Sequence, residues 1–227
     1  MQIDTFYIVD FDRCLGDVDG LFELLKNVTN DLYGIKSDEL QYARDIAESA
    51  GSSFNALGHI TQVVDGLDID VFKKVYIEKA KGVSDAILEH GATEFIKYLE
   101  SNNKSFCIIS YGDNDWQKLK IDACGLGYIK SFIVSSPNKS QYIRPWYDSK
   151  KDGFQIPSSL FNDNISRFTD DVVLIDDKME AFNDLPDKVR GYYIDINYSN
   201  MSNNIAVHPR VKTVKRIDEI ISLELGK

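Results

Sequence analysis

Two aspartates directly follow the first apolar run of the chain. Residues 6–9 are apolar and lead into Asp10, Phe11 and Asp12. Side chains alternate along an extended backbone, so Asp10 and Asp12 point to one side and Phe11 to the other. Paired carboxylates at the end of a strand are suited to nucleophilic attack, to proton transfer or to binding a cation.

Two later apolar runs end in polar residues of the same kind. Residues 106–109 lead to Ser110, and residues 172–175 lead to Asp176 and Asp177. In open parallel sheets, ligands bind at the carboxyl ends of the strands. Carboxylates that converge there repel one another unless a cation neutralises them, and an all-oxygen site suits Mg²⁺, which also binds a substrate phosphate. The sequence therefore predicts a magnesium and phosphate site at this edge.

The strands that would position these residues are visible in the sequence as short, nearly continuous apolar runs. This pattern is typical of parallel strands that are covered on both faces. Helical spacing lies between the runs, as in Phe95, Ile96 and Leu99. We therefore predict an α/β fold with a Rossmann-like, three-layer core around a parallel sheet. The strands are expected at residues 6–9, 106–109, 132–134, 172–175 and 192–194, with a surface loop at 197–204 and a last helix at 216–225.

One interval is too long for an ordinary strand connection. Asp12 and Ser110 are 98 positions apart, whereas a crossover between parallel strands needs only a dozen or so residues. The surplus, residues 17–89, consists of helical segments broken by Gly, Ser or Asp. We expect these helices at residues 20–34, 37–51, 53–64 and 68–82. The interval therefore predicts an all-helical insertion the size of a small domain.

Composition and charge narrow the function classes. The 227 residues carry a formal net charge of −10, with no basic cluster, so nucleic acid and anionic membranes are not expected partners. No apolar stretch approaches the roughly 20 residues that span a bilayer, and a secretory signal is not apparent. We expect a soluble cytoplasmic protein. Its cysteines, Cys14, Cys107 and Cys124, lack CxxC spacing and are expected to be reduced thiols, two of them in the core.

The order and spacing of the motifs resemble those of a known family. The chain contains DFDRCL followed by Asp17, then IISYG, then VLIDD. This set resembles the motifs of the haloacid dehalogenase-like superfamily, whose members are mostly phosphatases and phosphotransferases. The resemblance covers most of the chain, and the insertion falls where that family's helical C1-type cap sits. It implies a core formed by residues 1–16 and 90–227 and a cap formed by residues 17–89.

The resemblance also implies a role for each motif residue. Asp10 would be the nucleophile that forms an aspartyl-phosphate. Asp12 would protonate the leaving oxygen and then deprotonate the attacking water. Ser110 would hydrogen-bond the phosphoryl group. Asp176 and Asp177 would hold Mg²⁺, together with the carboxylate of Asp10 and the backbone carbonyl of Asp12.

Some positions depart from the family pattern. Arg13 and Cys14 stand where the family most often has Gly and Thr, and Arg13 could reach a second anionic group of the substrate. We expect Arg13, Ser110, Tyr111 and Gly112 to bind substrate. Without a histidine near Cys14 in the sequence, thiol catalysis is not expected.

Two further site positions have alternatives. The family uses a lysine between its third and fourth strands, and here Lys139 is favoured over Lys150 because Lys139 should begin a helix just beyond a strand end. No acid stands four residues after Asp177, so Asp176 or Asp184 is expected to complete the metal site.

These residues predict a magnesium-dependent phosphatase that hydrolyses a small phosphorylated metabolite through an aspartyl-phosphate. A phosphomutase of the same fold, a 2-haloacid dehalogenase and a non-catalytic phosphate-binding protein are the alternatives. A dehalogenase has no use for the second carboxylate, Asp12, or for magnesium. The candidate cap residues for substrate contact are Tyr42, Arg44, Phe54 and His59.

Overall fold

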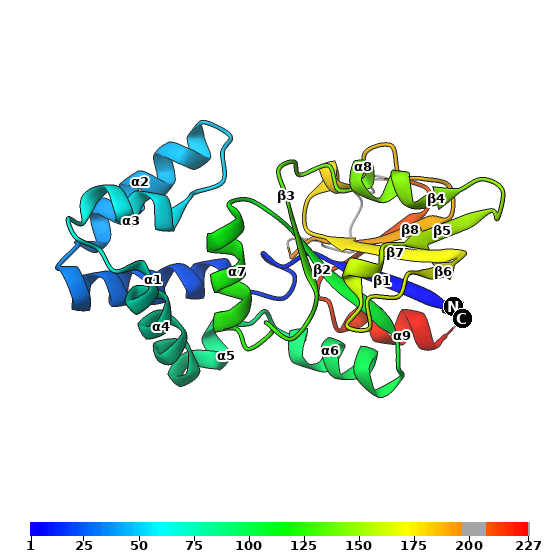
Figure 1. Cartoon of the computed structure of the whole chain (residues 1–227), viewed down its shortest axis with the longest axis horizontal. Coiled ribbons are helices and arrows are strands. Elements are labelled where there is room, and N and C mark those ends of the chain that lie inside the picture. The colour runs from blue at the N-terminus through cyan, green and yellow to red at the C-terminus, as the bar shows by residue number, and fades with distance from the viewer. Residues whose placement is uncertain (197–207, 227) are drawn as a thin grey trace.

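A six-stranded parallel sheet forms the centre of the protein (Figure 1). The computed structural model describes residues 1–196 and 208–226, so the loop predicted at 197–204 lies outside the described residues. The strands follow the order β3-β2-β1-β7-β8-β9. Their bounds are β1 (Thr5–Val9), β2 (Ser105–Tyr111), β3 (Ser131–Val134), β7 (Asp171–Asp176), β8 (Val189–Ile194) and β9 (Val211–Val214). The predicted α/β fold around a parallel sheet is confirmed.

The sequence analysis missed strand β9. This strand pairs with β8 at the edge of the sheet, and only Val214 of its four residues is buried. Lys212 and Thr213 interrupt the apolar residues of β9, so this strand lacks the continuous apolar run by which the other strands of the sheet were found.

Helices cover one face of the sheet (Figure 1). Tyr7 and Val9 of β1 point to this face and pack in the same apolar cluster as Phe95 and Leu99. The helices of the core are α6 (Ala92–Ser101), α7 (Asn114–Ala123) and α9 (Glu219–Leu225). The last helix therefore begins three residues later than the predicted start at 216.

The opposite face packs against a second, smaller sheet rather than against long helices. Phe6 and Ile8 of β1 point to this face and pack with Phe154 and Ile156 of the small sheet. The antiparallel order is β4-β5-β6, and the strands are too short to show a period in the sequence. The elements of this layer are α8 (Ser140–Ile143), η2 (Arg144–Trp146), β4 (Tyr147–Asp148), β5 (Gly153–Ile156), η3 (Ser158–Leu160), β6 (Arg167–Thr169) and η4 (Met179–Phe182).

The long interval between β1 and β2 is helical. Its elements are α1 (Val18–Tyr33), α2 (Ser37–Ser49), α3 (Ala56–Val63), α4 (Ile69–Ala80), η1 (Lys81–Val83) and α5 (Ser84–Ile87). Asp17 caps the start of α1 by accepting hydrogen bonds from the N–H groups of Asp19 and Gly20, and Gly34 ends the helix in the left-handed conformation, with φ of 68°. In Figure 1, α1 to α4 lie beyond one end of the sheet. Among the described residues, no helix combines the length and apolarity needed to cross a membrane.

Candidate active site

The strand register brings two of the predicted carboxylates together. β1 lies between β2 and β7, and Val9 is paired with Ile175 of β7. The N–H group of Asp10 donates a hydrogen bond of 2.9 Å to the carbonyl of Ile175, the residue before Asp176. Asp10 and Asp176 therefore leave the sheet side by side, and both are buried.

Lys139 lies between these two carboxylates. Its ammonium group contacts Oδ1 of Asp10 and Oδ2 of Asp176, and the side chain is 2% exposed. Burial acts to lower the pKa of Lys139, but the two carboxylates outweigh it, so the pKa is raised above its ordinary value. The lysine remains charged and offsets part of the negative charge at the sheet edge.

Lys139 is held in place by the short helix α8, which begins at the next residue. The hydroxyl of Ser140, the first residue of α8, donates a hydrogen bond of 2.7 Å to the carbonyl of Ala181 and so ties α8 to η4. Lys150, the alternative lysine, is exposed between β4 and β5.

A group of three potential metal ligands lies beside this ion pair. One ligand atom each from Asp10, Cys14 and Asp177 lies within 4.8 Å of the other two. Oδ1 of Asp177 is buried and has no hydrogen-bond partner among the described residues. Burial and the carboxylates of Asp10 and Asp176 raise the pKa of Asp177. Such an uncompensated carboxylate fits a bound cation.

The other predicted metal ligands are placed differently. Asp176 contacts Lys139 and accepts a hydrogen bond of 2.9 Å from the backbone N–H of Lys178, and it is not a member of the three-ligand group. Asp184 is also outside the group. Its side chain is 81% exposed and lies 3.9 Å from Arg144.

Asp12 is held by two side chains of α7 that the sequence analysis did not single out. Lys120 contacts Oδ1 of Asp12, and the amide of Gln117 donates a hydrogen bond of 2.9 Å to Oδ2. Burial acts to raise the pKa of Asp12, but the charge and hydrogen bond of Lys120, together with Gln117, lower it below its ordinary value. Both side chains are nearly fully buried, but α7 is rich in polar residues, so nothing in the sequence sets Gln117 and Lys120 apart.

Gln117 also connects Asp12 to Ser110. The hydroxyl of Ser110 donates a hydrogen bond of 3.1 Å to Oε1 of Gln117, and Nε2 of Gln117 donates one of 2.9 Å to the carbonyl of Tyr111. Ser110 is fully buried. The amide of Gln117 therefore links Asp12, which follows β1, to Ser110 and Tyr111 at the end of β2.

The loop between α2 and α3 approaches this site closely. Asn55 donates a hydrogen bond of 3.1 Å to Asp113. At Gly112, where φ is 144°, a Cβ atom would lie 2.9 Å from the hydroxyl of Ser53 and 2.7 Å from Nε2 of Gln117. Gly112 therefore permits both an unusual backbone conformation and the approach of the loop.

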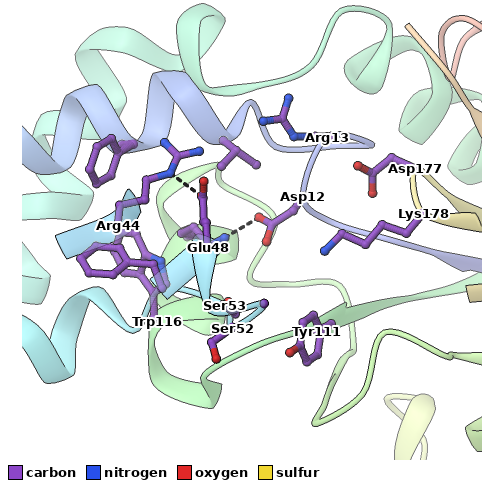
Figure 2. Close-up of a pocket in the computed structure, with 15 residues that line it drawn as sticks. Asp12, Arg13, Arg44, Glu48, Ser52, Ser53, Tyr111, Trp116, Asp177 and Lys178 are labelled. Carbon is purple, nitrogen blue, oxygen red and sulfur yellow. Dashed lines mark hydrogen bonds and ion pairs between the residues drawn. The ribbon is translucent and has the colours of Figure 1, made fainter. Parts of the chain in front are cut away.

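A cavity of about 430 Å³ lies between the helical insertion and the core (Figure 2). Asp12 and Asp177 line it from the core, and Ser52 and Ser53 line it from the α2–α3 loop. Four basic side chains, Arg13, Arg44, Lys120 and Lys178, and four aromatic side chains, Phe22, Phe54, Tyr111 and Trp116, also line the cavity. It therefore offers charged and aromatic surfaces to a ligand beside Asp12.

The candidate cap residues divide into two groups. Arg44 and Phe54 line the cavity, whereas Tyr42 is 69% exposed and His59 packs against Phe54 with ring centroids 5.9 Å apart. Arg44 is itself held in place, because its Nε donates a hydrogen bond of 2.7 Å to Glu48 and its guanidinium lies over the ring of Phe22 at 4.7 Å.

The turn after β1 holds Arg13 in the left-handed conformation, with φ of 62°. This conformation favours glycine, and an arginine adopts it at a cost of about 1–3 kcal/mol. The side chain of Arg13 is 45% exposed, lines the cavity and lies 3.9 Å from Asp19.

All three cysteines are buried free thiols, one more than the two expected in the core. The turn after β1 places Cys14 beside Asp10.

Several solved structures share the fold of this chain over nearly its whole length. A haloacid dehalogenase-like hydrolase from Burkholderia xenovorans matches with a TM-score of 0.60 and 15% identity, over 98% of this chain and 97% of its own. The magnesium-bound hydrolase YfnB from Bacillus subtilis matches with a TM-score of 0.52 and 14% identity, over 98% and 99%. A protein described as a beta-phosphoglucomutase from Thermotoga maritima matches with a TM-score of 0.51 and 16% identity, over 99% of both chains.

No protein-family model matches the sequence. No curated protein matches it significantly either. The structural matches nevertheless extend over nearly the whole chain, which therefore has the haloacid dehalogenase-like fold.

Proposed function

We propose that this protein is a magnesium-dependent phosphatase that hydrolyses a small phosphorylated metabolite through an aspartyl-phosphate on Asp10. The observation that carries the proposal is the arrangement around Asp10. This buried carboxylate ends the central strand, contacts Lys139 and lies beside Asp177, whose Oδ1 has no partner in the described part of the chain. A transferring phosphoryl group disperses negative charge over its oxygens, so its transfer requires positive charge beside the nucleophile, which Lys139 and a cation held by Asp10 and Asp177 would supply.

Two side chains would carry the covalent steps. A carboxylate oxygen of Asp10 attacks phosphorus, the bond from phosphorus to the leaving oxygen breaks, and Asp12 gives that oxygen its proton. Water then attacks the phosphorus of the aspartyl-phosphate while Asp12 takes the proton of the water, so inorganic phosphate leaves and Asp10 is restored. Lys120 and Gln117 favour the ionised form of Asp12, and the negative charge of a bound phosphoryl group would shift Asp12 back toward its protonated form.

The residues present fit a hard divalent cation. The carboxylates of Asp10 and Asp177 would hold Mg²⁺ together with the backbone carbonyl of Asp12. Asp176 would contribute indirectly, through its ion pair with Lys139. When bound, the ion supplies positive charge for the phosphoryl oxygens. Ser110 would donate to the same oxygens after its hydroxyl turns from Gln117.

The helices between β1 and β2 would act as a cap. Residues of α1, α2 and the α2–α3 loop line the cavity that also contains Asp12 and Asp177. Closure of this cap would exclude water during the transfer and limit the size of the substrate.

Screening phosphorylated metabolites with Mg²⁺ tests the proposal. Turnover should stop in excess EDTA and in Asp10→Asn, a nearly isosteric change that removes the nucleophilic charge. Asp12→Asn should reduce turnover by roughly 10²–10⁴, and an activated ester should still load phosphate onto Asp10, detectable by mass spectrometry. Undiminished turnover in EDTA, or in Asp10→Asn, would contradict the proposal.

Phosphomutase activity is the second candidate, because one structure with this fold is described as a beta-phosphoglucomutase. Product analysis separates the two activities: a phosphatase releases inorganic phosphate, whereas a mutase returns an isomer of its substrate. Halide release from a haloacid by the wild type would favour a dehalogenase instead. Magnesium-dependent ligand binding without any turnover would favour a phosphate-binding protein.

A further inference from the structure

We propose that Cys14, with Asp10 and Asp177, forms a binding site for a thiophilic divalent cation such as Zn²⁺, and that this ion competes with Mg²⁺ for the two carboxylates. The effect on activity rests on the proposed function, whereas the binding of the ion does not. The cysteine thereby makes the site sensitive to soft metals.

The geometry of the three ligands suits one ion. Their ligand atoms lie within 4.8 Å of one another. Zinc binds thiolate sulfur at about 2.3 Å and carboxylate oxygen at about 2.0–2.2 Å. Binding of one ion would draw the two carboxylates toward the sulfur, and a water molecule would complete four ligands.

Cys14 differs from the other two cysteines in what surrounds its sulfur. Cys107 packs in the apolar cluster on the far side of the sheet, and Sγ of Cys124 donates a hydrogen bond of 3.3 Å to the carbonyl of Ile87. Cys14 also belongs to an apolar cluster and is only 1% exposed, but its sulfur lies within 4.8 Å of carboxylate oxygens of Asp10 and Asp177. None of the side-chain hydrogen bonds found in the described part of the chain involves this sulfur. The two nearby carboxylates make the sulfur a candidate metal ligand.

The backbone fixes this sulfur in place. The N–H groups of Cys14, Leu15 and Gly16 all donate to the carbonyl of Phe11, at 3.3, 2.9 and 2.8 Å. This tight turn leaves Cys14 little freedom, so the ligand is positioned before any ion arrives. Asp177 lines the cavity of about 430 Å³, which gives an ion a route to the site.

One carboxylate oxygen of Asp177 has no hydrogen-bond partner in the described part of the chain. Oδ1 of Asp177 is buried and makes no hydrogen bond among the described residues. The nearby Lys139 forms its ion pairs with Asp10 and Asp176 instead. A buried oxygen of this kind costs free energy unless a proton or a cation satisfies it.

The donor set decides which cation is preferred. Mg²⁺ takes oxygen ligands and gains little from sulfur, whereas Zn²⁺ and Cd²⁺ bind thiolate strongly. On binding, the thiol releases its proton to solvent and the sulfur forms a bond to the metal, with no change of oxidation state. The ion occupies the carboxylate of Asp10, so under the proposed function it prevents attack on phosphorus.

The test uses the whole protein and Cd²⁺ without Mg²⁺. Titration of the wild type should produce the ultraviolet sulfur-to-cadmium charge-transfer absorption. Cys14→Ser, which is nearly isosteric, should lose this absorption and bind Cd²⁺ at least about tenfold more weakly, a loss in the range seen when metal sites are perturbed. Its affinity for Mg²⁺ should change much less. The matched controls Cys107→Ala and Cys124→Ala should retain both the absorption and the affinity.

Three results would overturn the proposal: no absorption in the wild type, absorption that persists in Cys14→Ser, or absorption lost in Cys124→Ala instead. Circular dichroism checks that each variant folds, and Cys14→Ala gives the same expected loss if the serine variant does not. A wild type that binds Cd²⁺ through Cys14 but hydrolyses no phosphate ester would refute the proposed function and leave the metal site standing.

Discussion

At the scale of single residues, the ion pairs formed by Lys139 set the local charge around Asp10. Lys139 separates two buried carboxylates, Asp10 and Asp176, that would otherwise repel each other. Breaking a buried ion pair by removing one partner is costly, because the other charge stays buried without compensation.

We therefore expect Lys139→Met to lower the free energy of unfolding by about 3–5 kcal/mol, measured by urea denaturation. Under the proposed function, it should also reduce turnover by several orders of magnitude, because a fixed charge in a water-excluded site contributes strongly to transition-state binding. Lys150→Met is the control, because Lys150 is exposed and should change neither quantity. Equal effects of the two substitutions would contradict the assignment.

At the scale of elements, helices α1 and α5 pack so closely that one position requires glycine. A Cβ atom on Gly20 would lie 1.8 Å from the carbonyl oxygen of Ala86 in α5. We expect Gly20→Ala to force the two helices apart and to lower the free energy of unfolding by about 1–3 kcal/mol. At Gly82 a Cβ atom would meet nothing within 4 Å, so thermal unfolding of Gly82→Ala should show stability unchanged or slightly raised. A neutral Gly20→Ala would refute the close packing.

The connection from α5 to α6 contains a glutamate that should make stability depend on pH. Burial and the neighbouring Asp17 raise the pKa of Glu89 from 4.5 to about 7. The folded protein therefore keeps a proton that the unfolded chain has lost between these two values, so the free energy of unfolding falls as pH rises through this window.

Glu89→Gln removes this dependence, because glutamine resembles the protonated form at every pH. Near pH 8 the variant should be more stable than the wild type by about 1–2 kcal/mol, after allowance for solvent screening, and near pH 4 the two should be about equal. Urea denaturation across the pH range measures this, with Glu94→Gln on the exposed face of α6 as the control. Stabilisation that is the same at both ends of the range would contradict the titration of Glu89.

At the scale of the whole molecule, the helical insertion and the core enclose the cavity together. The α2–α3 loop is tied to the start of α7 by the hydrogen bond from Asn55 to Asp113, and the cavity measures about 430 Å³. Under the proposed function, we expect small phosphate esters to be hydrolysed, while phosphopeptides and phosphoproteins should react with much lower kcat/KM, because a closed cap would not accommodate a protein chain. Comparing kcat/KM along a series from small esters to phosphopeptides measures this limit. Similar values throughout would show that the cap does not close over the substrate.

The sequence by itself determined which residues stand at the ends of strands. Continuous apolar runs revealed strands β1, β2, β3, β7 and β8, and the polar residues at the ends of three of these runs, Asp10, Ser110 and Asp176, followed directly. The long interval likewise indicated helices before β2. These properties depend on local periodicity, which is visible along the chain.

Only the tertiary structure decided which side chains meet. The pairing of Asp12 with Lys120, the position of Cys14 beside Asp177 and the edge pairing of β9 join residues far apart in sequence. Such contacts depend on strand register and on how α7 packs on the sheet, and neither leaves a periodic signal. From the sequence alone, Lys120 of α7 would be expected on the surface, because a charged side chain is buried stably only beside a partner of opposite charge. Its partner, Asp12, is 108 positions away and is identified only by the tertiary structure.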